Sequence, residues 1–165
     1  GECRNFKELT PVPDEQLLTL VKAGMQPRSV GNQKDRDFII VTREDLVKAI
    51  SHNSIVAGPA RKASAAIVIV GKKGGVSFPD EWSFDCAAAA ENILLEAEHL
   101  GLGSLWLQVY PYQDRTIHLC NILDIPTELD PFCIVVIGYA ERKPVVLNRF
   151  DEREVSYDLY TNHKK

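Results

Sequence analysis

The sequence predicts an α+β fold of the sandwich type, in which helices flank a central β-sheet. Apolar runs rich in β-branched residues, typical of buried strands, occur at 38–42, 65–71, 104–111 and 131–140. Segments with the apolar spacing of helices lie between these runs, and this alternation is typical of a sandwich. Because 165 residues match the size of one domain, we expect a single domain over residues 1–165.

Four segments are predicted to be helical: 12–26, 43–52, 84–104 and 114–123. The first begins with a proline and two acidic residues, which suit the positive end of a helix. The third is the longest, and glycines stop it at 101 and 103. Its four consecutive alanines present a flat surface that another helix can approach closely.

Composition excludes several classes of function. The net charge is −4 and no basic run exceeds two residues, so no nucleic-acid footprint is visible. No apolar stretch approaches the roughly 20 residues of a membrane helix, and no secretory signal is recognisable. The four cysteines are too scattered for a disulfide scaffold, and no Cys/His spacing predicts a metal site. We therefore expect a cytoplasmic protein without a metal.

The loop after the first predicted helix combines small polar residues with charge. It contains Ser29, Gly31 and Asn32, which are residues of the kind that line ligands, and four consecutive charges follow at 34–37. Glycine lets a backbone approach a ligand closely, and serine and asparagine offer short hydrogen-bonding groups. The same residues also favour a simple turn, so the loop has two interpretations.

Several motifs occur together in an order that resembles the FMN-dependent nitroreductases, specifically their short members. They are "CRNFKE", "VPDEQLLTLVKAGMQ", "SVGNQ", "DCAAAAENILLEAEHLGLGSLWLQVYP" and "IPTELDPFCIVVIGYAERKP". The resemblance covers nearly the whole chain, and the block at 82–111 is its most specific part.

The resemblance implies a mixed central sheet flanked by helices and an obligate homodimer with two FMN molecules at its interface. A C-terminal arm of about 141–165 would embrace the partner subunit. This arrangement would account for the flat alanine surface and for a long polar tail. Within that tail, the alternating residues at 155–157 could add to a sheet edge.

The implied chemistry belongs to FMN, which accepts a hydride from NAD(P)H and passes electrons to a small oxidised acceptor such as a nitroaromatic or a quinone. The protein has to anchor the phosphate, donate a hydrogen bond to flavin N5 and place positive charge near N1. We therefore expect no catalytic side chain.

The resemblance assigns residues to these tasks. Arg4 would lie near the pyrimidine end of the flavin, and Arg149 would bind the phosphate with its two-pronged guanidinium. Both could instead be ordinary surface arginines. Ser29, Gly31 and Asn32 match the family's cofactor loop, which often reaches the partner's FMN.

Gln108, Val109 and Tyr110 match the strand end whose backbone N–H faces flavin N5. The alternative is a strand that simply ends at the following proline. Asn92 also matches a family position, but an asparagine there is explained by bonding a nearby backbone group.

The chain departs from the family pattern at the site itself. Gly1 and Glu2 stand where the family has an arginine and a serine, and Glu2 would repel a phosphate. Lys34-Asp35-Arg36 replaces Gln-Pro-Trp, although Arg28 or Arg36 could supply replacement charge. These departures favour a second hypothesis, a non-enzymatic binding protein of the same fold with an eroded or repurposed pocket.

Overall fold

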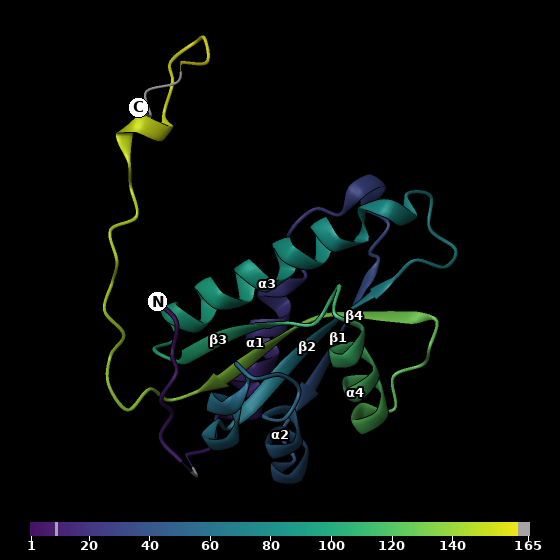
Figure 1. The fold of residues 1–165 in the computed structure, drawn as a ribbon, viewed down its shortest axis with the longest axis vertical. Helices are drawn as coiled ribbons and strands as arrows, with labels where there is room; N and C mark the ends of the chain where they lie inside the picture. Colours follow the sequence, from purple (N-terminus) through teal and green to yellow (C-terminus); the bar gives the residue numbers. More distant parts are fainter. Residues whose placement is uncertain (9, 162–165) are drawn as a thin grey trace.

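A central sheet lies between two layers of helices in the computed structural model, which describes residues 1–8 and 10–161 (Figure 1). Helices α1 (Asp14–Gly24) and α3 (Trp82–His99) cover one face of the sheet. Helices α2 (Glu44–Ile50) and α4 (Gln113–Leu123) cover the other. This three-layer arrangement confirms the predicted α+β sandwich and all four predicted helices, with ends shifted by a few residues.

The four predicted strands form one sheet in the order β1-β2-β4-β3. They are β1 (Arg36–Val41), β2 (Ala65–Lys72), β3 (Gly103–Gln108) and β4 (Leu129–Gly138). All three pairings between them are antiparallel, whereas a mixed sheet was expected. The central strands are apolar on both faces, and such a pattern indicates burial without indicating strand direction.

Strand β2 shows why its sequence is apolar without interruption. Ile67 and Ile69 point into the core beneath α1 and α3, while Val68 and Val70 point into the core beneath α2 and α4. All four are fully or almost fully buried. Alternate side chains of a strand point to opposite faces, so a strand covered on both faces must be apolar at every position.

Helix α1 packs closely on α3 through a glycine. A Cβ atom on Gly24 would lie 2.9 Å from Cδ1 of Ile93, so the glycine permits the close approach. Nearby, Asn92 Nδ2 donates a hydrogen bond of 3.1 Å to the Ala23 carbonyl. This bond confirms the interpretation of Asn92 as the partner of a backbone group.

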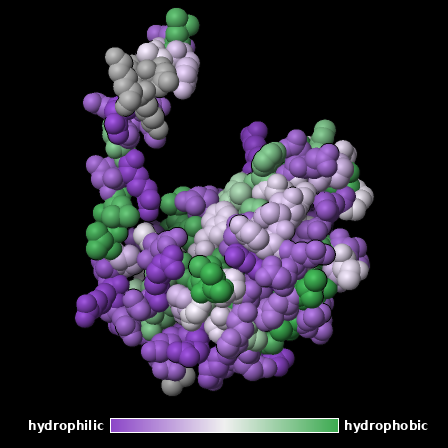
Figure 2. All heavy atoms as spheres, in the orientation of Figure 1, coloured by the Kyte–Doolittle hydropathy of each residue, from purple (hydrophilic) through white to green (hydrophobic). Residues whose placement is uncertain are grey.

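Residues 141–161 leave the globule as an arm (Figure 1). The arm contains one 3-10 turn at Glu152–Glu154, and residues 155–157 belong to no strand of the single chain. Figure 2 shows apolar side chains along the arm. The most exposed large apolar or aromatic side chains of the arm are Val145, Val146, Phe150, Tyr157, Leu159 and Tyr160. An arm with this much uncovered apolar surface is typical of a segment that packs on another chain.

Among the helices of the described residues, none has both the length and the apolar character needed to cross a membrane. The cytoplasmic location stays a prediction.

Candidate cofactor site

The loop at 29–32 and Arg149 lie toward opposite ends of α3, and the strand end at 108–110 lies between them. The loop lies beside the first turns of the helix, at Asp85, and the strand end reaches Trp82. Arg149 lines a hollow together with the second half of the helix, at 91–98, and with Trp106, whose Nε1 donates a hydrogen bond of 2.7 Å to Gln108 Oε1. At a rise of about 1.5 Å per residue, the loop contact at Asp85 and the hollow at 91–98 are roughly 10–20 Å apart along the helix.

The loop at 29–32 is a tight turn built from its own polar groups. The Ser29 hydroxyl accepts a hydrogen bond of 2.9 Å from the Lys34 N–H, and Gly31 and Asn32 adopt positive φ angles of 56° and 53°. A Cβ atom on Gly31 would lie 2.9 Å from the ring of Phe78. The turn predicted from composition is therefore present, and its glycine is required by both φ and the neighbouring ring.

Gln33 fixes this loop to the segment that leads into α3. Its Nε2 donates to the Phe78 carbonyl at 3.0 Å, and its Oε1 accepts from the Phe78 N–H at 3.0 Å. A side-chain amide that pairs with both groups of one backbone residue fixes position and orientation together.

Two buried carboxyl groups lie beneath the loop. Asp35 is fully buried, and its Oδ2 accepts a hydrogen bond of 2.7 Å from Gln33 Nε2. Asp85 of α3 accepts the Val30 N–H at 3.3 Å. Burial and the adjacent Asp35 carboxyl raise the pKa of Asp85 to about 6, because both disfavour its charged form.

The arginine that follows, Arg36, is also buried and is committed to the protein interior. Its guanidinium donates to the Met25 carbonyl at 3.1 Å and lies 5.9 Å from the centre of the Phe38 ring. Arg36 therefore does not supply a free positive charge to a ligand in this conformation, and Arg28 and Lys34 are the exposed cations of the loop.

Three N–H groups at the strand end 108–110 donate hydrogen bonds to the same backbone carbonyl, that of Phe132. The backbone N–H groups of Val109 and Tyr110 both donate to the Phe132 oxygen at 3.0 Å, and Gln108 Nε2 donates to it at 3.2 Å. A carbonyl oxygen has two lone pairs, so three donors share two sites. One of these donors can turn to a ligand without leaving the carbonyl unpaired.

An aromatic cluster surrounds this strand end. The Tyr110 ring is 41% exposed and meets Trp82 edge to face, with 4.8 Å between ring centres. Tyr110 also lies near-parallel to Phe132, at 6.5 Å. Tyr110 therefore offers a partly exposed aromatic surface beside the shared donors.

Arg149 lines a hollow of about 490 Å³ between the first two residues of the chain, α3 and β3. Leu94, Leu95 and Trp106 form its apolar walls. Carboxylates also line it, and they belong to Glu2, Glu91 and Glu98. Arg4 pairs with Glu2 at 3.0 Å between Nη2 and Oε2, and both side chains are exposed.

The profile of the Nitroreductase family matches residues 52–139, more than half of the chain. The chain belongs to the nitroreductase family. A protein of Archaeoglobus fulgidus, provisionally named NADH dehydrogenase/NAD(P)H nitroreductase, is 39% identical over 129 residues, which are 78% of this chain and 74% of that protein.

Solved structures of nitroreductase relatives agree with this fold. A Clostridium acetobutylicum protein, provisionally named NADH oxidase, superposes with a TM-score of 0.92 at 33% identity, over 97% of this chain and 96% of that one. An FMN-dependent nitroreductase of Clostridium difficile superposes with a TM-score of 0.88 at 26% identity, over 97% and 95%.

Sequence reasoning missed the buried carboxyl pair of this nitroreductase-family chain. In the sequence, the four consecutive charges at 34–37 stand out only as a departure from the family pattern, and the structure buries Asp35 and Arg36. A signal was available in α3, because Asp85 falls on the same helical face as the buried Trp82 and Ala89. A carboxylate on a buried face requires a partner nearby.

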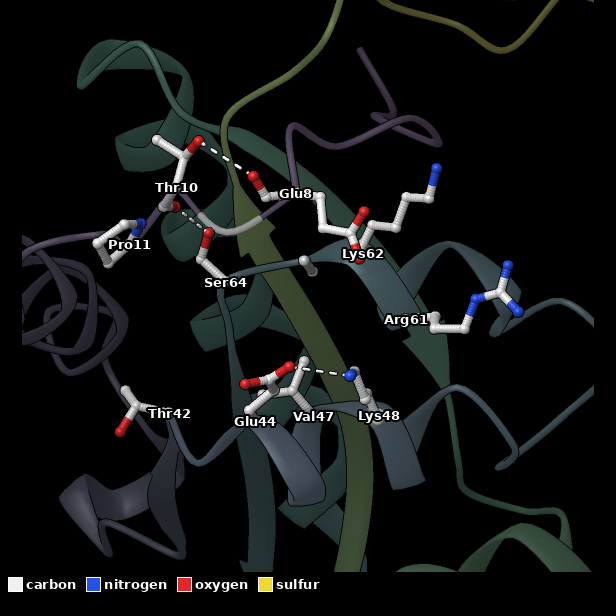
Figure 3. A pocket seen from close by; sticks show the side chains of 11 residues that line it. Glu8, Thr10, Pro11, Thr42, Glu44, Val47, Lys48, Arg61, Lys62 and Ser64 are labelled. Atoms are coloured by element: carbon white, nitrogen blue, oxygen red, sulfur yellow. Dashed lines mark hydrogen bonds and ion pairs between the residues drawn. The ribbon is translucent and has the colours of Figure 1, made fainter.

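A separate hollow of about 280 Å³ lies between α2, the 3-10 turn Gly58–Lys62 and the segment after the N-terminus (Figure 3). On its α2 side Lys48 pairs with Glu44 at 2.8 Å, and elsewhere in its lining the Ser64 hydroxyl donates to the Thr10 carbonyl. Its lining includes none of the predicted cofactor residues, so it has no part in the candidate site.

Proposed function

We propose that this protein is a homodimeric FMN-dependent oxidoreductase, which transfers electrons from NAD(P)H to a small oxidised acceptor such as a nitroaromatic or a quinone. Family membership and the names of its relatives support this proposal. The observation that carries it is the hollow beside α3, where apolar walls face an arginine in a chain of this family.

The residues of the hollow suit the two chemical parts of FMN. The surfaces of Leu94, Leu95 and Trp106 suit a planar aromatic ring, and Arg149 suits a phosphate. Arg4 is available as a second cation, because its pair with Glu2 is exposed and such pairs contribute at most about 1 kcal/mol. Bound FMN would supply the redox chemistry, and these residues would hold and orient it.

A second copy of the chain would bring the loop at 29–32 and Arg149 together. Within one chain, the loop at 29–32 and Arg149 lie near opposite ends of α3. In an antiparallel pair, the loop of one subunit would lie beside the arginine of the other. We propose that residues 1–165 form a single domain, whose arm at about 141–165 embraces the partner.

A second candidate function is a binding protein without turnover. Three carboxylates line the hollow, and they would oppose a phosphate. The same surroundings would favour a neutral or cationic planar ligand. A protein that only binds such a ligand carries out no electron transfer.

Reconstitution with FMN separates the two functions. We expect the purified protein to be yellow, to bleach when NADH or NADPH is added under nitrogen, and to recover its colour with a quinone or nitroaromatic acceptor. A protein that stays colourless after FMN addition and gel filtration would overturn the proposal and favour the binding protein.

Replacing Arg149 by alanine is expected to weaken FMN binding by roughly 10- to 150-fold, since a charge-assisted hydrogen bond contributes about 1.5–3 kcal/mol. Fluorescence titration of FMN measures the change. The matched control is Arg142→Ala, which removes an exposed arginine of the same arm that does not line the hollow. Equal affinities of the two variants would remove Arg149 from the phosphate site.

Replacing Glu2 by glutamine is expected to strengthen FMN binding by about fivefold. The change removes a negative charge from the hollow and frees Arg4, and an interaction between exposed charges is worth up to about 1 kcal/mol. Glu8→Gln is the control, because Glu8 does not line this hollow. The gain should shrink at high salt, and a gain that is independent of salt would contradict the electrostatic explanation.

A further inference from the structure

The two buried carboxyl groups beneath the cofactor loop have fewer hydrogen-bond donors than acceptors. Asp35 Oδ1 is buried without a hydrogen-bond partner, while Oδ2 accepts from Gln33. Both oxygens of Asp85 share the single Val30 N–H, at the long distances of 3.3 and 3.4 Å. The Asp35 carboxyl raises the pKa of Asp85 through a side-chain hydrogen bond and through its charge, so the two carboxyl groups are neighbours. One proton held between them would supply the missing donor.

Other charged groups near the pair leave this shortage in place. Among the described residues, Arg36 of β1 acts on Asp85 through its charge, but its guanidinium bonds the Met25 carbonyl. Asp130 of β4 adds negative charge nearby, and it acts on the adjacent Cys86 thiol of α3. Burial raises the pKa of that thiol well above its usual range, so Cys86 stays neutral.

The pair also connects the loop to the rest of the fold. Asp85 belongs to α3 and binds the backbone of the loop at Val30. Asp35 ends the loop, where its carbonyl accepts the Lys72 N–H at 2.7 Å and so joins the loop to β2. A bond between the two carboxyl groups therefore closes the loop onto the helix.

We propose that Asp35 and Asp85 share one proton, which bridges Asp35 Oδ1 to Asp85, and that this proton positions the loop at 29–35 for FMN. The part of this inference that concerns FMN rests on the proposed function. Loss of the proton places two carboxylates side by side, and their repulsion loosens the loop. Asp35 and Asp85 are positioning residues that need not touch the cofactor.

The direction of the pH effect follows from the protonation states. The pKa of Asp85 is about 6 in the folded protein, above the ordinary 3.8 of the unfolded chain. Between these values the folded state binds more protons, so stability falls as pH rises from about 4 to about 6. Above that range both states are ionised, and the contribution of the shared proton is absent.

Thermal unfolding of the protein without FMN tests the pair directly. In Asp85→Asn, the amide replaces the shared proton as a permanent donor to Asp35 and still accepts the Val30 N–H. We expect the Tm of this variant to match that of the parent at pH 4.5 and to exceed it by about 5 °C at pH 7.5. Asp35→Asn should behave alike, and it serves as a second variant if Asp85→Asn does not fold. Protein concentration is held constant throughout.

Asp37→Asn is the matched control, because Asp37 lies two residues from Asp35 but is exposed and pairs with Lys72. Its Tm difference from the parent should not change with pH over this range. If the Tm differences of Asp85→Asn and Asp35→Asn from the parent are also independent of pH, the pair shares no proton and the proposal is overturned.

FMN titration at pH 5.0 and pH 7.5 separates this proposal from the proposed function. FMN affinity of the parent relative to Asp85→Asn should fall at least threefold between these pH values. This comparison cancels the titration of the FMN phosphate, whose second pKa is about 6. A pH-dependent Tm difference in a protein that binds no FMN would retain the proton pair and overturn the proposed function. A protein that binds FMN but whose Tm difference does not change with pH would retain the proposed function and overturn the shared proton.

Discussion

Replacing Gly71 by alanine is expected to lower the free energy of unfolding by about 3 kcal/mol, which lowers the Tm by roughly 6–12 °C. An added Cβ atom would lie 2.1 Å from Cε3 of Trp82, and no rotation of a methyl group relieves so close a contact. Trp82 is buried against Tyr110 and Phe132, so it cannot move without disturbing the aromatic cluster beside the strand end. Urea unfolding followed by circular dichroism measures the loss.

Gly74→Ala is the matched control for this experiment. Gly74 lies in the turn after β2, and an added Cβ atom there would have no neighbour within 4 Å. Its stability should stay within about 0.5 kcal/mol of the parent. Gly71→Ala made in a Trp82→Leu background should cost less than in the parent, because the smaller side chain leaves room. Equal costs in both backgrounds would show that Trp82 is not the obstacle.

The elements of the fold could be predicted because their signals are local. β-Branched runs predicted the four strands, and Gly101 with a φ of +74° ends α3 where the sequence placed its stop. The direction of the strands could not be predicted in the same way. At Ile67 and Val68 the chain is buried on both faces, and burial alone does not distinguish an antiparallel from a parallel neighbour.

The candidate site was less accessible to sequence reasoning, because burial of its charges depends on tertiary contacts. Asp35 and Arg36 stand in a charged run, which ordinarily predicts exposure. Pairing of Arg36 with Gly71 places the start of β1 under α3, and this register draws Asp35 toward Asp85. Local patterns carry no information about such a register.

The separation of Ser29 from Arg149 likewise depends on tertiary structure, which local sequence patterns do not reveal. Resemblance assigned Ser29 and Arg149 to one cofactor, whereas the fold of a single chain holds them near opposite ends of α3. A site shared between two copies accounts for both facts, and the exposed apolar arm supplies a means of association. The arm is therefore the feature on which the proposed shared site depends most.

Replacing Leu147 and Phe150 together by aspartate is expected to weaken the proposed homodimer by more than 100-fold. The two side chains are 61% and 74% exposed in the single chain. Burying each against a partner contributes about 1.5–3 kcal/mol, and burying a carboxylate in its place adds a further cost. Sedimentation velocity over a range of protein concentrations measures the shift from dimer to monomer.

Asn148→Asp is the control, because it adds a charge between the two apolar positions without removing apolar surface. It should remain dimeric at concentrations where the double variant is monomeric. Since Arg149 lies between the two altered positions, the double variant should also lose FMN when the dimer dissociates, although its own arginine is intact. A monomeric variant that retains full FMN affinity would place the whole cofactor site within one chain, and a double variant that stays dimeric would place the arm outside the interface.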